Sequence, residues 1–138
     1  MGMSNTAADI HKYDTAEVLN RQLLKQYRQL KVGLLDRLIA AYLDEAPVYF
    51  AKIRDAVEKE NFDDIVWGSH SLKSCSGNLG AVRLSHVCQL MENAARAKDR
   101  DEVVSLFEKL GPESFEAEEA LKGERLALQQ GNSQSDGR

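Results

Sequence analysis

The stretch from residue 61 to residue 80, NFDDIVWGSHSLKSCSGNLG, decides the fold of this chain. At about 100° per residue, one side of a helix over this stretch collects apolar residues and two serines: Phe62, Ile65, Leu72, Leu79, Ser69 and Ser76. His70 projects about 130° away from the centre of that side, so we expect its ring to face solvent. The helix should stop within Gly77–Gly80, because glycine is common just past the end of a helix. This stretch therefore predicts an amphipathic helix that presents a histidine to solvent.

Helical patterns continue on the N-terminal side of this stretch. Apolar residues three and four apart predict a first helix that begins with Asp14 or Thr15 as its N-cap. Gly33 ends that pattern, and a second helix follows it. Pro47 should begin a further helix in its first turn, since no amide donor is needed there, and that helix should end near Asn61.

Helical patterns also follow on the C-terminal side. The segment 81–99 is strongly amphipathic, with one apolar face made of Leu84, Val87, Cys88, Met91, Ala94 and Ala95. A helix over 101–110 should be kinked or interrupted at Gly111–Pro112 before the helical pattern resumes over 113–128. The last residues, 129–138, have the composition of a disordered tail.

These patterns together predict an all-α fold. No segment alternates apolar and polar residues as a strand does, and there is no internal repeat. Short connections between amphipathic helices favour an antiparallel four-helix bundle, here with one or two extra N-terminal capping helices. We expect a flexible lead-in over 1–13, the folded domain over 14–124 and a flexible tail over 125–138.

Composition excludes several classes of function. The net charge of -4 argues against a general nucleic-acid binder, which would carry a basic surface. No apolar run is long enough to span a membrane, and the N-terminus lacks the apolar core of a signal peptide. Two cysteines are too few for a disulfide framework and fit a reducing compartment. We therefore expect a cytoplasmic monomer that binds neither membrane nor nucleic acid.

The side of the helix around His70 suits a phosphate group. Trp67, Ser74 and Gly77 share that side, and Lys73 stands one turn away. The two small residues leave room for a phosphoryl group and for a docking partner, while an ammonium offsets the charge of the oxyanion. We expect Lys73 to be exposed, so that its removal changes stability by under about 0.5 kcal/mol.

The next helix adds candidates beside the histidine. If its apolar face packs on the first helix, Ser85, Gln89, Glu92 and Arg96 form its edge. Glu92 and Arg96 are spaced i, i+4 and can pair. We expect Glu92 to accept the ring N–H of His70 and so to hold the orientation of the imidazole.

The motif HSLKSCSGNLGA at residues 70–81, followed by LSHVCQLMENAAR at 84–96, resembles the signature of histidine phosphotransfer (HPt) domains. In that family a phosphoaccepting histidine is followed by a lysine three residues on, then by small residues and a glycine ten residues on. A second helix with a cysteine or a similar small apolar residue comes next. The residues that match this pattern are His70, Lys73, Gly77, Gly80 and Cys88. The resemblance covers roughly residues 14–124. The family usually has glycine where this chain has Ser74, and some members have glutamine in the place of Glu92 and arginine in that of Arg96.

The resemblance implies a role in a phosphorelay. His70 would attack a phosphoaspartate on a receiver domain and later pass the phosphoryl group to another receiver. The implied partners are response-regulator receiver domains and a hybrid sensor histidine kinase. The resemblance also implies that the chain is a phosphocarrier rather than an enzyme. It would need no cofactor of its own, since Mg²⁺ is expected in the receiver. The absence of GxxxxGK[ST] and GxGxxG motifs likewise argues against an ATP-binding kinase within the chain.

Other interpretations stay open from the sequence alone. His70, Cys75, His86 and Cys88 could form a metal site, although their spacings match no common zinc motif, and the two cysteines are more often core residues. Trp67 suits a partner contact and a cover on the core edge equally well. The chain could also be a helical adaptor without chemistry, or the C-terminal HPt fragment of a hybrid sensor histidine kinase.

Overall fold

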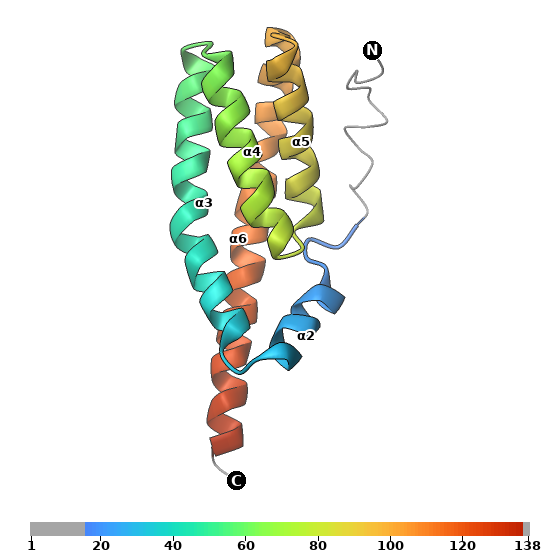
Figure 1. Cartoon of the computed structure of the whole chain (residues 1–138), viewed down its shortest axis with the longest axis vertical. Helices are drawn as coiled ribbons and strands as arrows, with labels where there is room; N and C mark the ends of the chain where they lie inside the picture. The colour runs from blue at the N-terminus through green and yellow to red at the C-terminus, as the bar shows by residue number, and fades with distance from the viewer. Residues whose placement is uncertain (1–15, 137–138) are drawn as a thin grey trace.

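The computed structural model describes residues 16–136, with side chains to residue 131, and they form helices and no strand. The five helices are α2 (Arg21–Leu30), α3 (Leu34–Glu58), α4 (Phe62–Asn78), α5 (Val82–Arg96) and α6 (Arg100–Asp136). Helices α3 to α6 run alternately up and down, each packs on the next, and α6 closes the bundle against α3 (Figure 1). The predicted antiparallel four-helix bundle is therefore confirmed, and α2 is the capping helix within the described residues.

The core lies along the bundle axis and follows the predicted apolar faces. Ile65 and Leu72 of α4 and its C-cap residue Leu79 are buried, and Ser69 and Ser76 lie among them. The α5 face is buried as predicted, at Leu84, Val87, Cys88, Met91, Ala94 and Ala95. The spacing of these residues on two neighbouring helices explains why α4 and α5 share the most extensive contact in the bundle.

The first described helix begins later than the sequence pattern predicted. The predicted caps, Asp14 and Thr15, lie outside the described residues, but α2 starts only at Arg21. Asn20 is the N-cap, and its side-chain oxygen accepts the amide N–H of Leu23 at 3.2 Å. Its own amide donates to the carbonyl of Gly80 at 2.7 Å, which holds Asn20 extended and delays the helix. A Cβ on Gly80 would lie 2.8 Å from the Cβ of Asn20, so this close approach requires glycine.

Pro47 does not begin a helix, contrary to the sequence prediction, and the last helix continues through Pro112 without an interruption. Pro47 lies inside α3 and Pro112 lies inside α6. A proline in a helix interior costs roughly 3 kcal/mol. Both prolines are exposed, and buried residues before and after each of them keep the helix packed on the core. Tertiary packing therefore outweighs the local penalty.

The C-terminal segment is helical where a disordered tail was predicted. Helix α6 continues to Asp136, and residues 137–138 lie outside the described part. The guanidinium of Arg125 donates to Asp36 of α3 at 2.9 Å, and Leu128 packs against the core. Contacts with α3 therefore extend the helix past residue 124. None of the helices between residues 16 and 136 combines the length and apolar character that crossing a bilayer requires.

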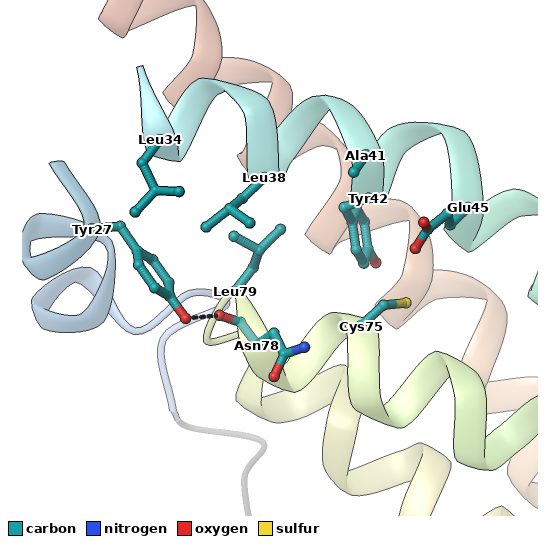
Figure 2. Close-up of a pocket in the computed structure, with 9 residues that line it drawn as sticks. All are labelled: Tyr27, Leu34, Leu38, Ala41, Tyr42, Glu45, Cys75, Asn78 and Leu79. Atoms are coloured by element: carbon teal, nitrogen blue, oxygen red, sulfur yellow. Dashed lines mark hydrogen bonds between the residues drawn. The ribbon is translucent and has the colours of Figure 1, made fainter. Parts of the chain in front are cut away.

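Helix α2 is attached to the end of the bundle where α3 begins and α4 ends. The hydroxyl of Tyr27 donates to the carbonyl of Asn78 at 2.8 Å (Figure 2). A cavity of about 330 Å³ lies between α2, α3 and α4, and Leu34, Leu38 and Leu79 form much of its apolar wall (Figure 2). This junction fixes α2 at the C-terminal end of the helix that carries His70.

Candidate functional site

His70 lies in the middle of α4 on the side that faces away from the core. Its side chain is 58% exposed, whereas Leu72 two residues later is fully buried. The ring nitrogen Nδ1 lies 3.2 Å from Oε1 of Glu92 on α5. A carboxylate accepts hydrogen bonds, so in the neutral ring this contact favours the tautomer with the proton on Nδ1 and the lone pair on Nε2. The histidine is therefore oriented from α5 and open to solvent on its Nε2 side.

Glu92 is the centre of a charged cluster between α4 and α5. Only 5% of the residue is exposed, so Glu92, which the sequence placed at the edge of the apolar face of this helix, is buried in the contact between the two helices. Its Oε2 accepts from Arg96 at 2.8 Å, and its Oε1 faces both His70 and Lys73. Burial, the largest influence, acts to raise the pKa of Glu92, but hydrogen bonds from Arg96, His70 and Lys73 together outweigh it and hold this pKa below its ordinary value. Glu92 is therefore a buried carboxylate that stays ionised.

Lys73 is less exposed than the sequence predicted. One quarter of its side chain is accessible, because the ammonium turns towards α5. Its Nζ donates to Oε1 of Gln89 at 2.8 Å and to Oε1 of Glu92 at 3.3 Å. Lys73 therefore has a structural role in joining the two helices, and it also brings a positive charge to the same oxygen that faces His70.

Two glycines of α4 allow the neighbouring helices to approach. A Cβ on Gly77 would lie 3.3 Å from Oγ of Ser85 on α5. A Cβ on Gly68 would lie 2.7 Å from Cγ1 of Ile53, a fully buried residue of α3. Sequence reasoning did not select Gly68, although a glycine inside a helix costs about 1 kcal/mol relative to alanine and so indicates a packing need. These contacts set the position of α4 and hence of His70.

The surface around His70 contains small residues and one large aromatic ring. Ser74 and Gly77 are both exposed, so the surface C-terminal to His70 on α4 carries little side-chain bulk. Trp67, half-exposed, packs edge-on against Tyr49 of α3 with 5.7 Å between ring centroids. The ammonium of Lys52 lies 5.2 Å from the centre of the Trp67 ring. Tyr49 and Lys52 were not selected from the sequence, because residues on separate helices show no common spacing.

The other candidate nucleophiles are less accessible than His70. Cys88 is fully buried, and burial also raises the pKa of the half-buried Cys75 thiol to about 11. His86 is partly buried on α5, and His11 lies outside the described residues. Within the part of the chain that the structure describes, no group of three or more His, Cys, Asp or Glu side chains is arranged to hold a metal ion. The open metal interpretation from the sequence thus has no supporting geometry there.

Comparison with known proteins supplies independent information on the family. Residues 37–132 match the Hpt domain family. The fold is similar to that of the crystal structure of histidine-containing phosphotransfer protein B from Pseudomonas aeruginosa PAO1, with 21% identity and a TM-score of 0.76 over 81% of this chain and 97% of that one. It is also similar to an X-ray structure of a candidate histidine-containing phosphotransfer protein from rice, with 18% identity and a TM-score of 0.72 over 89% of this chain and 90% of that one. Among curated proteins, none matches this chain in sequence.

Proposed function

Because this chain belongs to the Hpt domain family, and is thus a histidine phosphotransfer protein of phosphorelay signalling, we propose that His70 is its phosphoacceptor. The ring takes a phosphoryl group from a phosphoaspartate of a receiver domain and passes it to another receiver. One observation supports this assignment above the others. His70 is exposed while its Nδ1 faces a buried carboxylate at 3.2 Å, so that Nε2 is the free nucleophile.

The chemistry at His70 balances without a cofactor in this chain. The Nε2 lone pair attacks phosphorus, the N–P bond forms, and the P–O bond to the aspartate breaks with its electron pair going to the departing carboxylate. The proton on Nδ1 stays in place, so the phosphorylated ring carries positive charge. Glu92 faces that proton from a buried position, where its negative charge is weakly screened by water. Glu92 is therefore proposed as the residue that orients the ring and stabilises the phosphorylated form.

Lys73 and Arg96 supply the positive charges of the site. Both hold Glu92 in the unmodified protein. A phosphoryl group on Nε2 adds negative charge beside them, and an ammonium or guanidinium offsets such charge through charge-assisted hydrogen bonds. We propose that Lys73, three residues from His70 on the same helix, is the cation that supports the phosphoryl group, and that Arg96 keeps Glu92 in place.

The docking surface for the receiver is proposed to surround His70. Ser74 and Gly77 offer little side-chain bulk, so that another domain can approach the ring closely. Trp67 provides a half-exposed aromatic side chain beside it, held by Tyr49 and Lys52. Aromatic side chains of this kind often contribute most to an interface. Receiver domains of response regulators and of a hybrid sensor histidine kinase are the partners that the family implies.

Transfer from a radiolabelled phosphorylated receiver tests the proposal. The wild-type chain should acquire label that is labile to acid and stable to base. His70→Gln should remove this label, and the matched control His86→Gln should retain it. Label that persists in His70→Gln, in a protein whose helical circular dichroism signal is unchanged, would overturn the assignment of His70.

A further inference from the structure

Helix α2 and the turn after it are strongly basic in a chain that is acidic as a whole. Residues 20–35, NRQLLKQYRQLKVGLL, contain Arg21, Lys25, Arg28 and Lys31 and no Asp or Glu, whereas the whole chain has a net charge of -4. All four cations are exposed. Such a concentration of one sign of charge attracts a partner of the opposite sign.

The basic residues border two hollows between α2 and α6. One, of about 370 Å³, is lined by Arg21, Lys25 and Arg28 and by Glu124 of α6. The other, of about 210 Å³, is lined by Arg28, Lys31 and Val32 and, on its apolar side, by Leu35 and Leu128. Arg28 lines both hollows, so that the two share a wall. We call this region, from Arg21 to Val32 with the facing part of α6, the α2–α6 groove.

The acidic residues of the groove are already neutralised. Glu124 pairs with Arg21, and Asp36 accepts from Arg125 at 2.9 Å. Within residues 16–131, none of Lys25, Arg28 and Lys31 forms an ion pair with a carboxylate. Among the residues whose side chains are described, the groove therefore keeps an excess of positive charge.

Two large apolar side chains stand beside these cations. Leu30 is 75% exposed and Val32 is 90% exposed, at the turn between α2 and α3. Isolated exposed apolar residues are common on protein surfaces, but here Val32 lines a hollow with an apolar wall, and Leu30 lies two residues before it in the sequence. This hollow can bury an apolar side chain of a partner, whereas a purely ionic surface cannot.

The groove is separate from the phosphotransfer site. Its walls come from α2, the start of α3 and α6, and no residue of α4 or α5 lines either hollow. His70 and its charged cluster lie between α4 and α5. In Figure 1, α2 lies beside the end of the bundle where α3 begins, whereas His70 belongs to the middle of α4.

We propose that the α2–α6 groove binds an acidic peptide segment of another protein, with carboxylates on Lys25, Arg28 and Lys31 and one apolar side chain against Val32. Lys25 and Arg28 lie three residues apart on α2, about 4.5 Å along the helix axis, and Lys31 follows as the extended C-cap residue, so that the three cations suit successive carboxylates of a peptide. The apolar face of α2, with Leu24 and Tyr27, packs against the core rather than facing outward, which favours a peptide over a membrane as the occupant. The acidic charge of the rest of the chain disfavours a nucleic acid.

Fluorescence anisotropy with the full chain tests this proposal. The probe is a fluorescein-labelled peptide of Asp and Glu residues around one central leucine. Two control peptides replace the acids by Asn and Gln, or the leucine by serine. The acidic leucine peptide should bind at least about tenfold more tightly than the neutral one and measurably more tightly than the serine one, and its affinity should fall as salt is added.

Variants decide where the peptide binds. Lys25→Glu/Arg28→Glu should weaken binding by at least about tenfold, and the milder Lys31→Ala should weaken it by about threefold. The matched control is Arg54→Glu/Lys59→Glu, which changes the net charge equally at the other end of the bundle and should alter binding by less than about twofold. Circular dichroism should show unchanged helix content in each variant. If both double variants weakened peptide binding equally, the peptide would not bind specifically at the α2–α6 groove, and the proposal would be overturned.

Two further measurements test whether the groove binds another kind of ligand or belongs to the receiver-docking surface. Phosphatidylserine vesicles or duplex DNA should not displace the peptide at physiological salt. Displacement by either would show that the groove binds a membrane or a nucleic acid instead, and would overturn the peptide proposal. Lys25→Glu/Arg28→Glu should leave the rate of phosphoryl transfer to His70 within about twofold of wild type. A parallel loss of transfer would make the groove a part of the receiver-docking surface and would overturn its separate role.

Discussion

Replacing Lys73 by methionine removes one charge from the cluster around Glu92 while keeping most of the side-chain volume. The ammonium of Lys73 donates to Glu92 at 3.3 Å and to Gln89 at 2.8 Å. Glu92 is almost fully buried, so its carboxylate depends on protein partners rather than on water. In Lys73→Met, that carboxylate keeps only Arg96 and His70.

The size of the effect follows from burial. Hydrogen bonds to charged groups contribute about 1.5–3 kcal/mol to stability when buried. The Lys73 side chain is 25% exposed, and its ion pair with Glu92 is partly screened by solvent. The contribution of this pair to stability is therefore smaller than that of a fully buried pair. We expect Lys73→Met to lower the free energy of unfolding by about 1–2 kcal/mol, more than the sequence-based expectation for an exposed lysine. The coupling between Lys73→Met and Glu92→Gln should be about 1 kcal/mol.

Urea unfolding of wild type, both single variants and the double variant measures this coupling. All four proteins should unfold with the same dependence on urea, so that differences in midpoint report stability alone. A coupling energy below about 0.3 kcal/mol would contradict this prediction, because the Lys73–Glu92 pair would then contribute almost nothing to stability. The same variants test function, since Lys73→Met should slow phosphoryl transfer by at least about tenfold if its charge supports the phosphoryl group.

Further predictions follow from packing, titration and exposure. Gly68→Ala should lower stability by about 1–2 kcal/mol in thermal unfolding, because overpacking against Ile53 exceeds the gain in helix propensity. Gly123→Ala, in open space on α6, should instead raise it by up to about 1 kcal/mol, and equal effects at the two sites would contradict this packing argument. Since the folded-state pKa of Glu92 is lowered, its stabilising charge is present above the ordinary carboxyl pKa and lost as pH falls through the lowered value. The stability difference between wild type and Glu92→Gln should therefore shrink in acid, and a difference that grows there would be inconsistent with an ionised Glu92. Trp67→Ala should weaken receiver binding by about tenfold in calorimetry, with little change in unfolding, whereas a large loss of stability with intact binding would make Trp67 a core residue.

Regular periodicity explains what could be predicted of the fold. The apolar side of α4 recurs at the helical period, and Ile65, Leu72 and Leu79 are buried as that period requires. The prolines were placed wrongly because a local rule assigns each a helix start or break. The length of α3 around Pro47 depends on contacts with other helices, and those contacts are not visible within one segment.

The charged cluster was only partly predictable, for a similar reason. The spacing of Glu92 and Arg96 on one helix is readable from the sequence, and so is the spacing of His70 and Lys73 on another. That Lys73 turns away from solvent, and that Glu92 is buried, depends on how closely α4 and α5 approach. That distance is set by small residues such as Gly77, whose effect appears only when both helices are in place.

The role of His70 is tested most directly by determining which nitrogen of which histidine carries the phosphoryl group after transfer from a receiver. Long-range proton–nitrogen NMR correlations of the imidazole rings distinguish Nδ1 from Nε2 and one histidine from another. We predict phosphorylation of His70 at Nε2 with the proton retained on Nδ1, because Glu92 faces Nδ1 at 3.2 Å. A phosphoryl group on Nδ1 of His70, or on His86, would contradict it.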